Sequence, residues 1–463
     1  MSRKLLLAFI LGMILVLTVT LTMIGCKSTT GTTAAAETTA AAEVTGEAAP
    51  AKEVELRFTV IADYVKMFQA FAAAFEAENP GVKIKLDVMG DKVQYKEMGP
   101  QIFAGSDAPD MAFYWFDTQS PSDKMIQAGI LEPLNDVLIP DFDNNIPANI
   151  ATFYKNRGQD VGGIYYAAPI TTTFFPIIYY NKTIFDEVGI KAPEGTSPTL
   201  EEFYGIADKL KAAGYDAMTS GFLEGYLVGH LRDVVWQNAI SEEVMADITS
   251  NWKPGSEPKY SFTNDEVVAA TQIIKDIYDN VYSNASIGRS FAEGRAAFIQ
   301  GKVGMYQDMT SGAAIIKNEA AKDFKLGWFY YPKLRDDIDV KMLNYSGMAI
   351  LIPKGGPNVD IAKKFTAFLV SKEAQVDYGK YGFIPIRTDI DVAAIKESLG
   401  YPVANILEFA IENGSIDAWD SMVVSEFTMK SFTLLQEMLS GTKTAQQICE
   451  EFDSLAKEIR ERK

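Results

Sequence analysis

A repeated alternation between two hydrophobic periods constrains this chain more than any other feature. The segment VELRFTVIADY, which begins at Val54, alternates apolar and polar residues, whereas the next segment, VKMFQAFAAAFEAENPG, repeats apolar residues at helical spacing until Pro80 and Gly81. VKIKLDV then alternates again. These periods predict a strand, a helix and a strand, and their succession favours an α/β fold with mainly parallel strands.

The same alternation recurs further along the chain. DMAFYW predicts a buried strand, SDKMIQAGIL a short helix, and TLEEFYGIADKLKAAG a helix that begins with a capping box of Thr199 and Glu202. The chain from Val54 to Lys463 is long enough for two or three domains. In α/β sheets, ligands bind beyond the carboxyl ends of the strands, so we expect functional residues there.

The first 25 residues have the pattern of a secretory signal peptide. Arg3 and Lys4 precede a long uncharged run that ends at Ile24, and a basic start followed by an apolar stretch is typical of export. The motif MIGC resembles the bacterial lipobox, in which the cysteine is lipidated. The run is long enough to span a bilayer, but we expect lipidation at Cys26, which would anchor the protein extracytoplasmically, on the periplasmic side or at the cell surface.

The segment 26–53 is rich in Thr, Ala, Glu and Gly and contains no aromatic residue. Such a segment cannot bury enough apolar surface to offset the entropy cost of ordering it, so we expect a disordered linker. Cys449, the only other cysteine, lies at an apolar position of a helical pattern. No intrachain disulfide is therefore expected, and the folded part must depend on the size of its core.

Charge and residue types exclude several classes of function. The net charge of −18 argues against nucleic acid and against anionic lipid as partners. His230 is the only histidine, which excludes a multi-histidine metal site, and we expect it to be a satisfied surface or helix residue. PDFDNN begins like a calcium loop, but Ile146 and Thr152 stand where the loop needs glycine and glutamate. We expect neither a metal nor another cofactor.

Aromatic residues and carboxylates cluster at several points, as a site for a neutral sugar requires. A pyranose offers an apolar face and a rim of hydroxyls, which fit aromatic rings and planar polar groups. FYWFDTQS places Tyr114, Trp115 and Asp117 at a strand end, where the pleat should divide its residues between core and cleft. Alternatively, Asp117 has a structural role and caps the N-terminus of a helix.

Nine segments, in order, resemble the extracellular sugar-binding proteins of ABC importers, the family that contains maltose-binding protein. They are FAAAFEAENPGVKIKLDV, FAGSDAPDMAFYWFD, AGILEPLNDVL, YYAAPITTTFFPIIYYNKTIFDEVGI, PTLEEFYGIADKLKAAGYDAM, FAEGRAAFIQGKVGMYQDMTSG, LGWFYYPKL, GMAILIPKGGPNVDIAKKFTAFLVSKEAQVDYG and GFIPIR. The resemblance covers about Val54 to Asp389. It implies a type II fold of two lobes with mixed sheets, a hinge of crossing segments and a sugar-binding cleft between the lobes.

The resemblance also implies boundaries, partners and roles. Lobe one would comprise 54–168 and 346–392, and lobe two 169–345 and 393–463. A monomer without enzyme activity would deliver its carbohydrate ligand to the transmembrane subunits of an ABC permease. Asp117 would accept sugar hydroxyls, Glu224 would be a ligand carboxylate and Tyr226 a stacking aromatic. The other candidate ligand-binding residues are Asp63, Tyr64, Tyr114, Trp115, Thr173, Phe174, Trp236, Asp308, Ser311, Trp328 and Tyr345.

Some of these candidates have a structural alternative. Trp236 can equally be a helix core residue, and Asp308 a helix cap. Met309, Thr310 and Ser311 stand where the family commonly has Gly-Ser-Trp, so the missing tryptophan argues against maltodextrin specificity. We expect Trp328, Phe329 or Tyr345 to supply the second stacking ring instead.

Other classes of function stay open. The ligand could be a polyol or a polyamine, since acidic clefts also suit cations. A secreted glycoside hydrolase needs two carboxylates, and Asp117, Glu224 and Asp308 could provide them, although nothing in the sequence favours that role. A structural adhesin would be marked by tandem repeats, and we find none.

We predict that Cys26→Ser releases the protein from membranes, because the thiol is the attachment point of the lipid. Detergent phase partitioning of both forms measures this: the wild type should enter the detergent phase and the variant the aqueous phase. Retention of both forms in detergent would contradict lipidation at Cys26 and favour a retained membrane helix.

Overall fold

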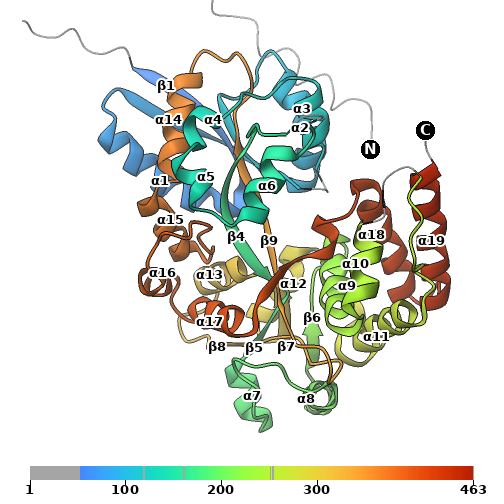
Figure 1. Ribbon diagram of the computed structural model, residues 1–463. Coiled ribbons are helices and arrows are strands. Elements are labelled where there is room, and N and C mark those ends of the chain that lie inside the picture. Colours follow the sequence, from blue (N-terminus) through green and yellow to red (C-terminus); the bar gives the residue numbers. More distant parts are fainter. Residues whose placement is uncertain (1–52, 118–119, 160–161, 251, 253–254, 462–463) are drawn as a thin grey trace, which may run out of the picture. The chain divides into compact units, whose positions relative to one another are not determined.

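The computed structural model describes residues 53–461, except 118–119, 160–161, 251 and 253–254. The signal peptide, Cys26 and nearly all of the linker lie outside the described residues. Contacts group Lys52–Lys463 as one compact unit. Within the described residues the strands form two sheets (Figure 1): one has the order β10-β9-β3-β1-β2, with β4 also paired to β9, and the other has the order β6-β7-β5-β8.

We call the part of the unit that packs around the first sheet the first lobe. Its elements are β1 (Val54–Ile61), η1 (Ala62–Tyr64), α1 (Val65–Glu78), β2 (Val82–Met89), α2 (Lys92–Ala104), β3 (Met111–Trp115), α3 (Ser122–Gln127), α4 (Asn135–Leu138), α5 (Asp141–Asn144), α6 (Ala148–Asn156), α14 (Val359–Leu369), α15 (Lys372–Tyr378) and η3 (Gly379–Tyr381). Alternate residues of β1 form its core: Leu56, Phe58 and Val60 are fully buried. Phe68 of α1 packs edge-on against Phe58, with 4.8 Å between ring centroids.

The second lobe packs around the four-stranded sheet. Its elements are β5 (Ile177–Asn181), α7 (Lys182–Val188), α8 (Leu200–Ala212), β6 (Asp216–Thr219), α9 (Tyr226–Ala239), α10 (Glu242–Ser250), α11 (Asp265–Val281), η2 (Asn284–Gly288), α12 (Phe291–Ile299), β7 (Val303–Asp308), α13 (Thr310–Glu319), β8 (Leu326–Phe329), α16 (Val392–Leu399), α17 (Val403–Asn413), β10 (Ser415–Asp417), η4 (Trp419–Ser421), α18 (Ser425–Leu439) and α19 (Ala445–Glu461). β10 belongs to the first sheet through its pairing with β9.

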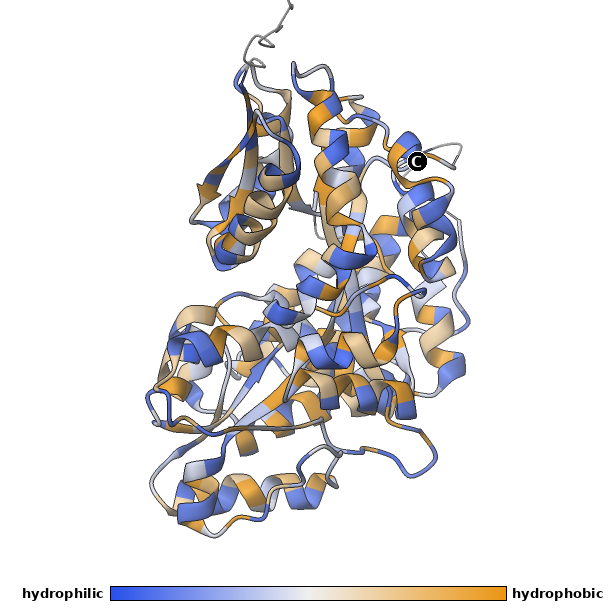
Figure 2. Cartoon of the chain, turned by 90° about the vertical axis from the view of Figure 1, so that its left-hand side faces the viewer, coloured by the Kyte–Doolittle hydropathy of each residue, from blue (hydrophilic) through white to orange (hydrophobic). Residues whose placement is uncertain are grey.

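Apolar and polar residues alternate around the helices of both lobes (Figure 2). The pattern is pronounced in α19, which buries Ile448, Cys449, Phe452 and Leu455 and leaves its charged residues outside. The prediction of a buried, helical Cys449 is therefore confirmed. In the part of the chain that the structure describes, no helix combines the length and apolarity needed to cross a membrane.

Two strands, β4 (Ala168–Phe175) and β9 (Met342–Leu351), run from one core to the other. They pair antiparallel. Ile170 of β4 and Ile350 of β9 are buried in the first core, whereas Phe175 and Leu343 are buried in the second. Tyr345, in between, packs against both cores. These strands therefore connect the two lobes.

The predicted strands, helices and capping box are confirmed in β1, α1, β2, β3, α3 and α8. The expectation of mainly parallel pairing is wrong. β1 pairs parallel with β2 and β3, and the β6–β7 and β9–β10 pairs are also parallel, but the β3–β9, β4–β9, β5–β7 and β5–β8 pairs are antiparallel. The reason is that β5 follows β4 with only Pro176 between them and β9 enters the first sheet from the second lobe, so neither strand reaches its sheet through a helical crossover from a neighbouring strand.

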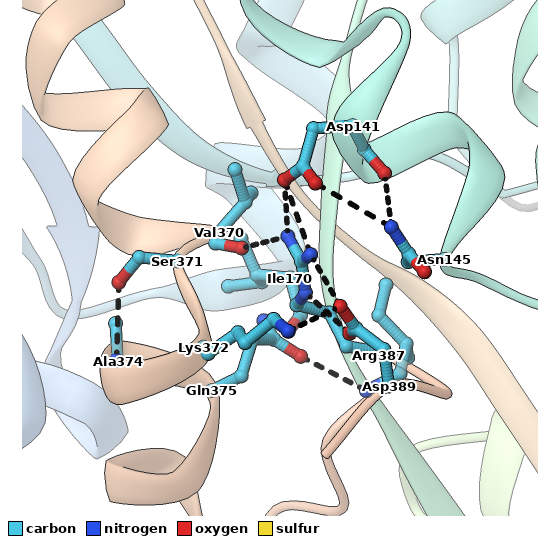
Figure 3. A network of polar contacts seen from close by, with 11 residues as sticks. Asp141, Asn145, Ile170, Val370, Ser371, Lys372, Ala374, Gln375, Arg387 and Asp389 are labelled. Atoms are coloured by element: carbon cyan, nitrogen blue, oxygen red, sulfur yellow. Dashed lines mark hydrogen bonds and ion pairs between the residues drawn. The ribbon is translucent and has the colours of Figure 1, made fainter.

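A polar network holds the residues that follow η3, among them Arg387 and Asp389, against the rest of the first lobe (Figure 3). The side chain of Arg387 is almost fully buried and donates to Asp141 Oδ2 at 3.0 Å and to Asp389 Oδ1 at 2.9 Å. Lys372 forms an ion pair with Asp389 at 2.8 Å. Gln375 accepts a hydrogen bond from the backbone N–H of Ile386 at 2.9 Å. Asp141, which lies in the segment PDFDNN that only begins like a calcium loop, is an ion-pair partner of Arg387.

We predict that Arg387→Met lowers the free energy of unfolding by about 2 kcal/mol, because it removes several charge-assisted hydrogen bonds from a buried position. Urea unfolding followed by tryptophan fluorescence measures the change. Lys380→Met is the matched control: its ion pair with Asp377 is exposed, so its loss should cost less than about 1 kcal/mol. Equal effects of the two substitutions would contradict the anchoring role of Arg387.

Candidate ligand-binding cavity

A cavity of about 340 Å³ lies between the two lobes, beside the crossing strands. That volume is within the usual range for small-molecule sites. The first lobe contributes Asp63, Tyr64, Lys92, Lys96, Trp115 and Asp117 to its lining; the crossing strands contribute Phe175 and Tyr345. The second lobe contributes Glu224, Tyr226, His230, Phe291, Met309 and Ser311.

The end of β3 divides its side chains between core and cavity, as the pleat requires. Tyr114 and Phe116 are fully buried in the first core, whereas Trp115 and Asp117 line the cavity. The Tyr114 hydroxyl donates to the backbone carbonyl of Lys96. Tyr114 is therefore a core residue that supports α2 and does not face the cavity.

Asp117 lies between the first lobe and the crossing strands. Its Oδ2 accepts hydrogen bonds from Lys96 Nζ at 3.1 Å and from the hydroxyl of Tyr345. The expected alternative, a helix N-cap, does not apply, because α3 begins at Ser122 without a side-chain cap. The carboxylate of Asp117 and the ring of Tyr345 also border a second cavity of about 570 Å³.

Lys92 joins the two lobes across the cavity. Its ammonium group lies 3.3 Å from Glu224 Oε2 and donates to the Tyr226 hydroxyl at 3.2 Å. Asp63 Oδ2 of the first lobe lies 4.0 Å from the same ammonium group. Glu224 is held by the backbone N–H of Phe291, which donates to Oε1 at 2.9 Å. Lys92 thus links α2 to the residues that precede and begin α9.

His230 is a helix residue, in α9, as one form of the expectation had it, and it also lines the cavity. Its ring lies 4.0 Å from that of Phe175 and 5.4 Å from that of Tyr226, measured between centroids. Burial, together with the charge of Arg232, lowers the pKa of His230 to about 3, so the imidazole is neutral at ordinary pH. The spacing of four residues from Tyr226 places both on one helix face and could have indicated this position.

Several candidates lie away from the cavity lining. Trp236 is fully buried in the second core, where its Nε1 donates to Thr271 Oγ1 at 3.1 Å. Thr173 forms a hydrogen bond of 2.7 Å with the hydroxyl of Thr310. Trp328 is buried in β8, edge-on to Phe409. Phe174 is likewise a core residue. The second stacking ring expected from Trp328 is therefore not at the cavity, whereas Tyr345 is.

Asp308 is buried at the end of β7, below the lining residues Met309 and Ser311. Its Oδ1 accepts a hydrogen bond from the backbone N–H of Met309 at 2.7 Å. Burial raises the pKa of Asp308 to about 7, although Arg295 and Lys92 act in the opposite direction. It belongs to the framework of the cavity and not to its lining.

Sequence reasoning missed Lys92 and Lys96, both of which line the cavity. They lie four residues apart and so share a face of α2, but only the packing of α2 beside β3 shows that this face meets the cavity. It also missed Leu223, Asp420, Met429 and Phe432, whose segments reach the cavity only in the folded second lobe.

A family model described as bacterial extracellular solute-binding protein matches residues 61–376. The multiple sugar-binding protein of Streptococcus mutans is 22% identical over 73% of this chain and 74% of its own length. A Brucella abortus relative, named only as a binding protein, is 32% identical, but the chain spans only 38% of that relative's length.

Solved structures share the fold. A chitin oligosaccharide binding protein has a TM-score of 0.71 and 20% identity, covering 88% of this chain and 99% of that one. A solute-binding protein of an ABC transporter from Thermotoga lettingae, bound with α-D-tagatose, has a TM-score of 0.69 and 18% identity, covering 89% and 100%. The type II architecture of two lobes with mixed sheets is therefore confirmed. By the match to the family model, this chain belongs to the family of bacterial extracellular solute-binding proteins.

Proposed function

We propose that this protein is the extracytoplasmic substrate-binding lipoprotein of an ABC importer and captures a sugar or oligosaccharide in its interlobe cavity. One observation carries the proposal: aromatic and carboxylate side chains from both lobes meet at a cavity beside the strands that connect those lobes. Relatives named as sugar-binding proteins support the same conclusion.

The cavity offers what a sugar requires. The carboxylates of Asp117 and Glu224 can accept hydrogen bonds from hydroxyl groups, and the ammonium group of Lys96 can donate them. Trp115 and Tyr345 offer rings against which the apolar face of a pyranose can stack. Lys92 and Lys96 are paired with carboxylates, and Asp63 and Glu97 also line the cavity, so its charge suits a polyamine as well and the panel below includes that class.

A ligand that contacts both lobes favours the closed arrangement and shifts the population toward it. The closed form would then dock on the transmembrane subunits of the permease as a monomer held to the membrane through lipidated Cys26. We place the lobe boundaries at 54–168 with 346–392, and at 169–345 with 393–463. In this proposal the protein has no enzyme activity.

A panel of saccharides, polyols and polyamines tests the proposal. We expect thermal stabilisation and measurable heat in calorimetry with at least one saccharide, since a ligand that binds only the folded state raises its stability. If polyamines alone stabilise the protein, its ligand is a cation and not a sugar. New reducing ends after incubation with oligosaccharides would instead favour a hydrolase.

We predict that Asp117→Ala weakens saccharide binding at least tenfold, about 1.4 kcal/mol. The site would lose a hydrogen-bond acceptor, and Lys96 and Tyr345 would lose the carboxylate to which they donate. Calorimetry with the tightest saccharide of the panel measures the dissociation constant. Asp107→Ala is the control, since Asp107 is exposed and pairs with Arg57 outside the cavity. Wild-type affinity in Asp117→Ala would remove this carboxylate from the site.

We predict that Asp308→Asn leaves affinity within twofold of wild type but changes how stability depends on pH. The pKa of Asp308 is about 7 in the folded protein and 3.8 ordinarily. Between these two pH values the folded form therefore keeps a proton on Asp308 that the unfolded chain has released. Wild-type stability is thereby lowered as pH rises from about 4 to 7, and asparagine removes this loss.

Thermal unfolding of both forms between pH 4.5 and pH 8.5 measures the difference. The melting temperature of Asp308→Asn minus that of wild type should rise by at least about 2 °C from pH 5 to pH 8. Groups that titrate in both forms cancel in this difference. A difference independent of pH, or a loss of saccharide affinity, would contradict the framework role.

A further inference from the structure

The two sides of the cavity differ in polarity. The first lobe presents mainly charged groups, among them Lys92, Lys96 and Asp117. The second lobe presents apolar side chains beside Glu224, which we call the apolar wall and define as Leu223, Phe291, Met429 and Phe432. Lys92 Nζ of the first lobe lies over the ring of Phe291, 4.5 Å from its centroid, so the open part of the wall is at the other three residues. The apolar face of a bare sugar ring is used in stacking on Trp115 or Tyr345, and its rim of hydroxyls does not cover such a wall.

The apolar wall is held in place by its own lobe. The backbone N–H of Leu223 donates to the carbonyl of Arg289 at 3.0 Å, and Gln436 Nε2 of α18 donates to the carbonyl of Phe222 at 2.7 Å. Phe432 packs on α9 where Gly225 leaves room: a Cβ there would lie 2.8 Å from that of Phe432. The wall is therefore a built surface and not a loose loop.

Two side chains of this fixed surface remain in contact with solvent. Leu223 is 58% exposed and Met429 is 46% exposed, although both line the cavity. Large apolar side chains that gather at one exposed place mark binding surfaces, and removing their area from water is favourable. A ligand gains this free energy only if it brings an apolar group to the wall.

The opposite side of the cavity fixes which part of the ligand faces the wall. Lys96 is paired with Asp117, and Lys92 with Glu224. Together with Asp63 and Glu97, these pairs form a polar surface that suits hydroxyl groups and has more carboxylates than ammonium groups. A sugar ring would bind along this surface, with its substituent directed at the second lobe.

We propose that the ligand is a saccharide with an apolar substituent, either the methyl of an acetamido group or an aryl aglycone, which lies against the apolar wall. This inference rests on the proposed function and narrows it to a substrate class. Both kinds of substituent bring an apolar group to the wall, and the experiment below tests each of them separately.

Calorimetry with matched pairs tests the inference: cellobiose against its di-N-acetylamino analogue chitobiose, and cellobiose against its p-nitrophenyl glycoside. We expect at least one derivative to bind about tenfold more tightly than cellobiose. In the double variant Leu223→Ser/Met429→Ser, that preference, taken as the ratio of the two affinities in the same variant, should fall below threefold.

Ile411→Ser is the matched control, because Ile411 is 60% exposed on α17 and does not line the cavity; it should keep the full preference. Derivatives that bind no tighter than cellobiose, or a double variant that keeps the preference, would overturn the inference and leave the proposed function standing. If no saccharide, bare or substituted, binds the wild type, the proposed function falls and the inference with it.

Discussion

The antiparallel ladder between β4 and β9 is the constraint on which the rest of the structure depends. Both strands carry side chains of both cores, so the ladder cannot be broken without exposing backbone groups and apolar residues together. It places Phe175 and Tyr345 beside the cavity. The network around the buried Arg387 fixes the residues that follow η3 to the first lobe. In the proposed mechanism, the lobes move about β4 and β9, which connect them, while the ladder between these strands stays intact.

The charges in the cavity form a second level of organisation. Lys96 holds Asp117 within the first lobe, whereas Lys92 reaches from α2 to Glu224 in the second. Each pairing reduces the cost of placing carboxylates where water is partly excluded. The result is a polar surface facing an apolar wall. In the proposal above, that contrast orients the ligand.

The sequence predicted local structure well and strand pairing poorly. Hydrophobic period and the Thr199–Glu202 capping box depend only on neighbouring residues, so the early elements and α8 were predicted correctly. Pairing depends on partners far along the chain, and the expected parallel arrangement failed at β9 and β5. For the cavity, strand alternation separated Trp115 and Asp117 from their buried neighbours. Trp236 lies in the core, which is the alternative that its helical pattern offered, and Trp328, which has no such local signal, lies there too.

By itself, then, the sequence determined the α/β class, the resemblance to sugar-binding proteins and the acidic, aromatic character of the candidate site. Only the tertiary structure decided which of those residues meet. Lys92, His230 and Phe432 lie on three different helices, and they line one cavity because α2 packs in the first lobe, whereas α9 and α18 pack against each other in the second. Periodicity shows which face of a helix is apolar. It cannot show which distant segment that face will contact, because such contacts are selected by packing over the whole fold.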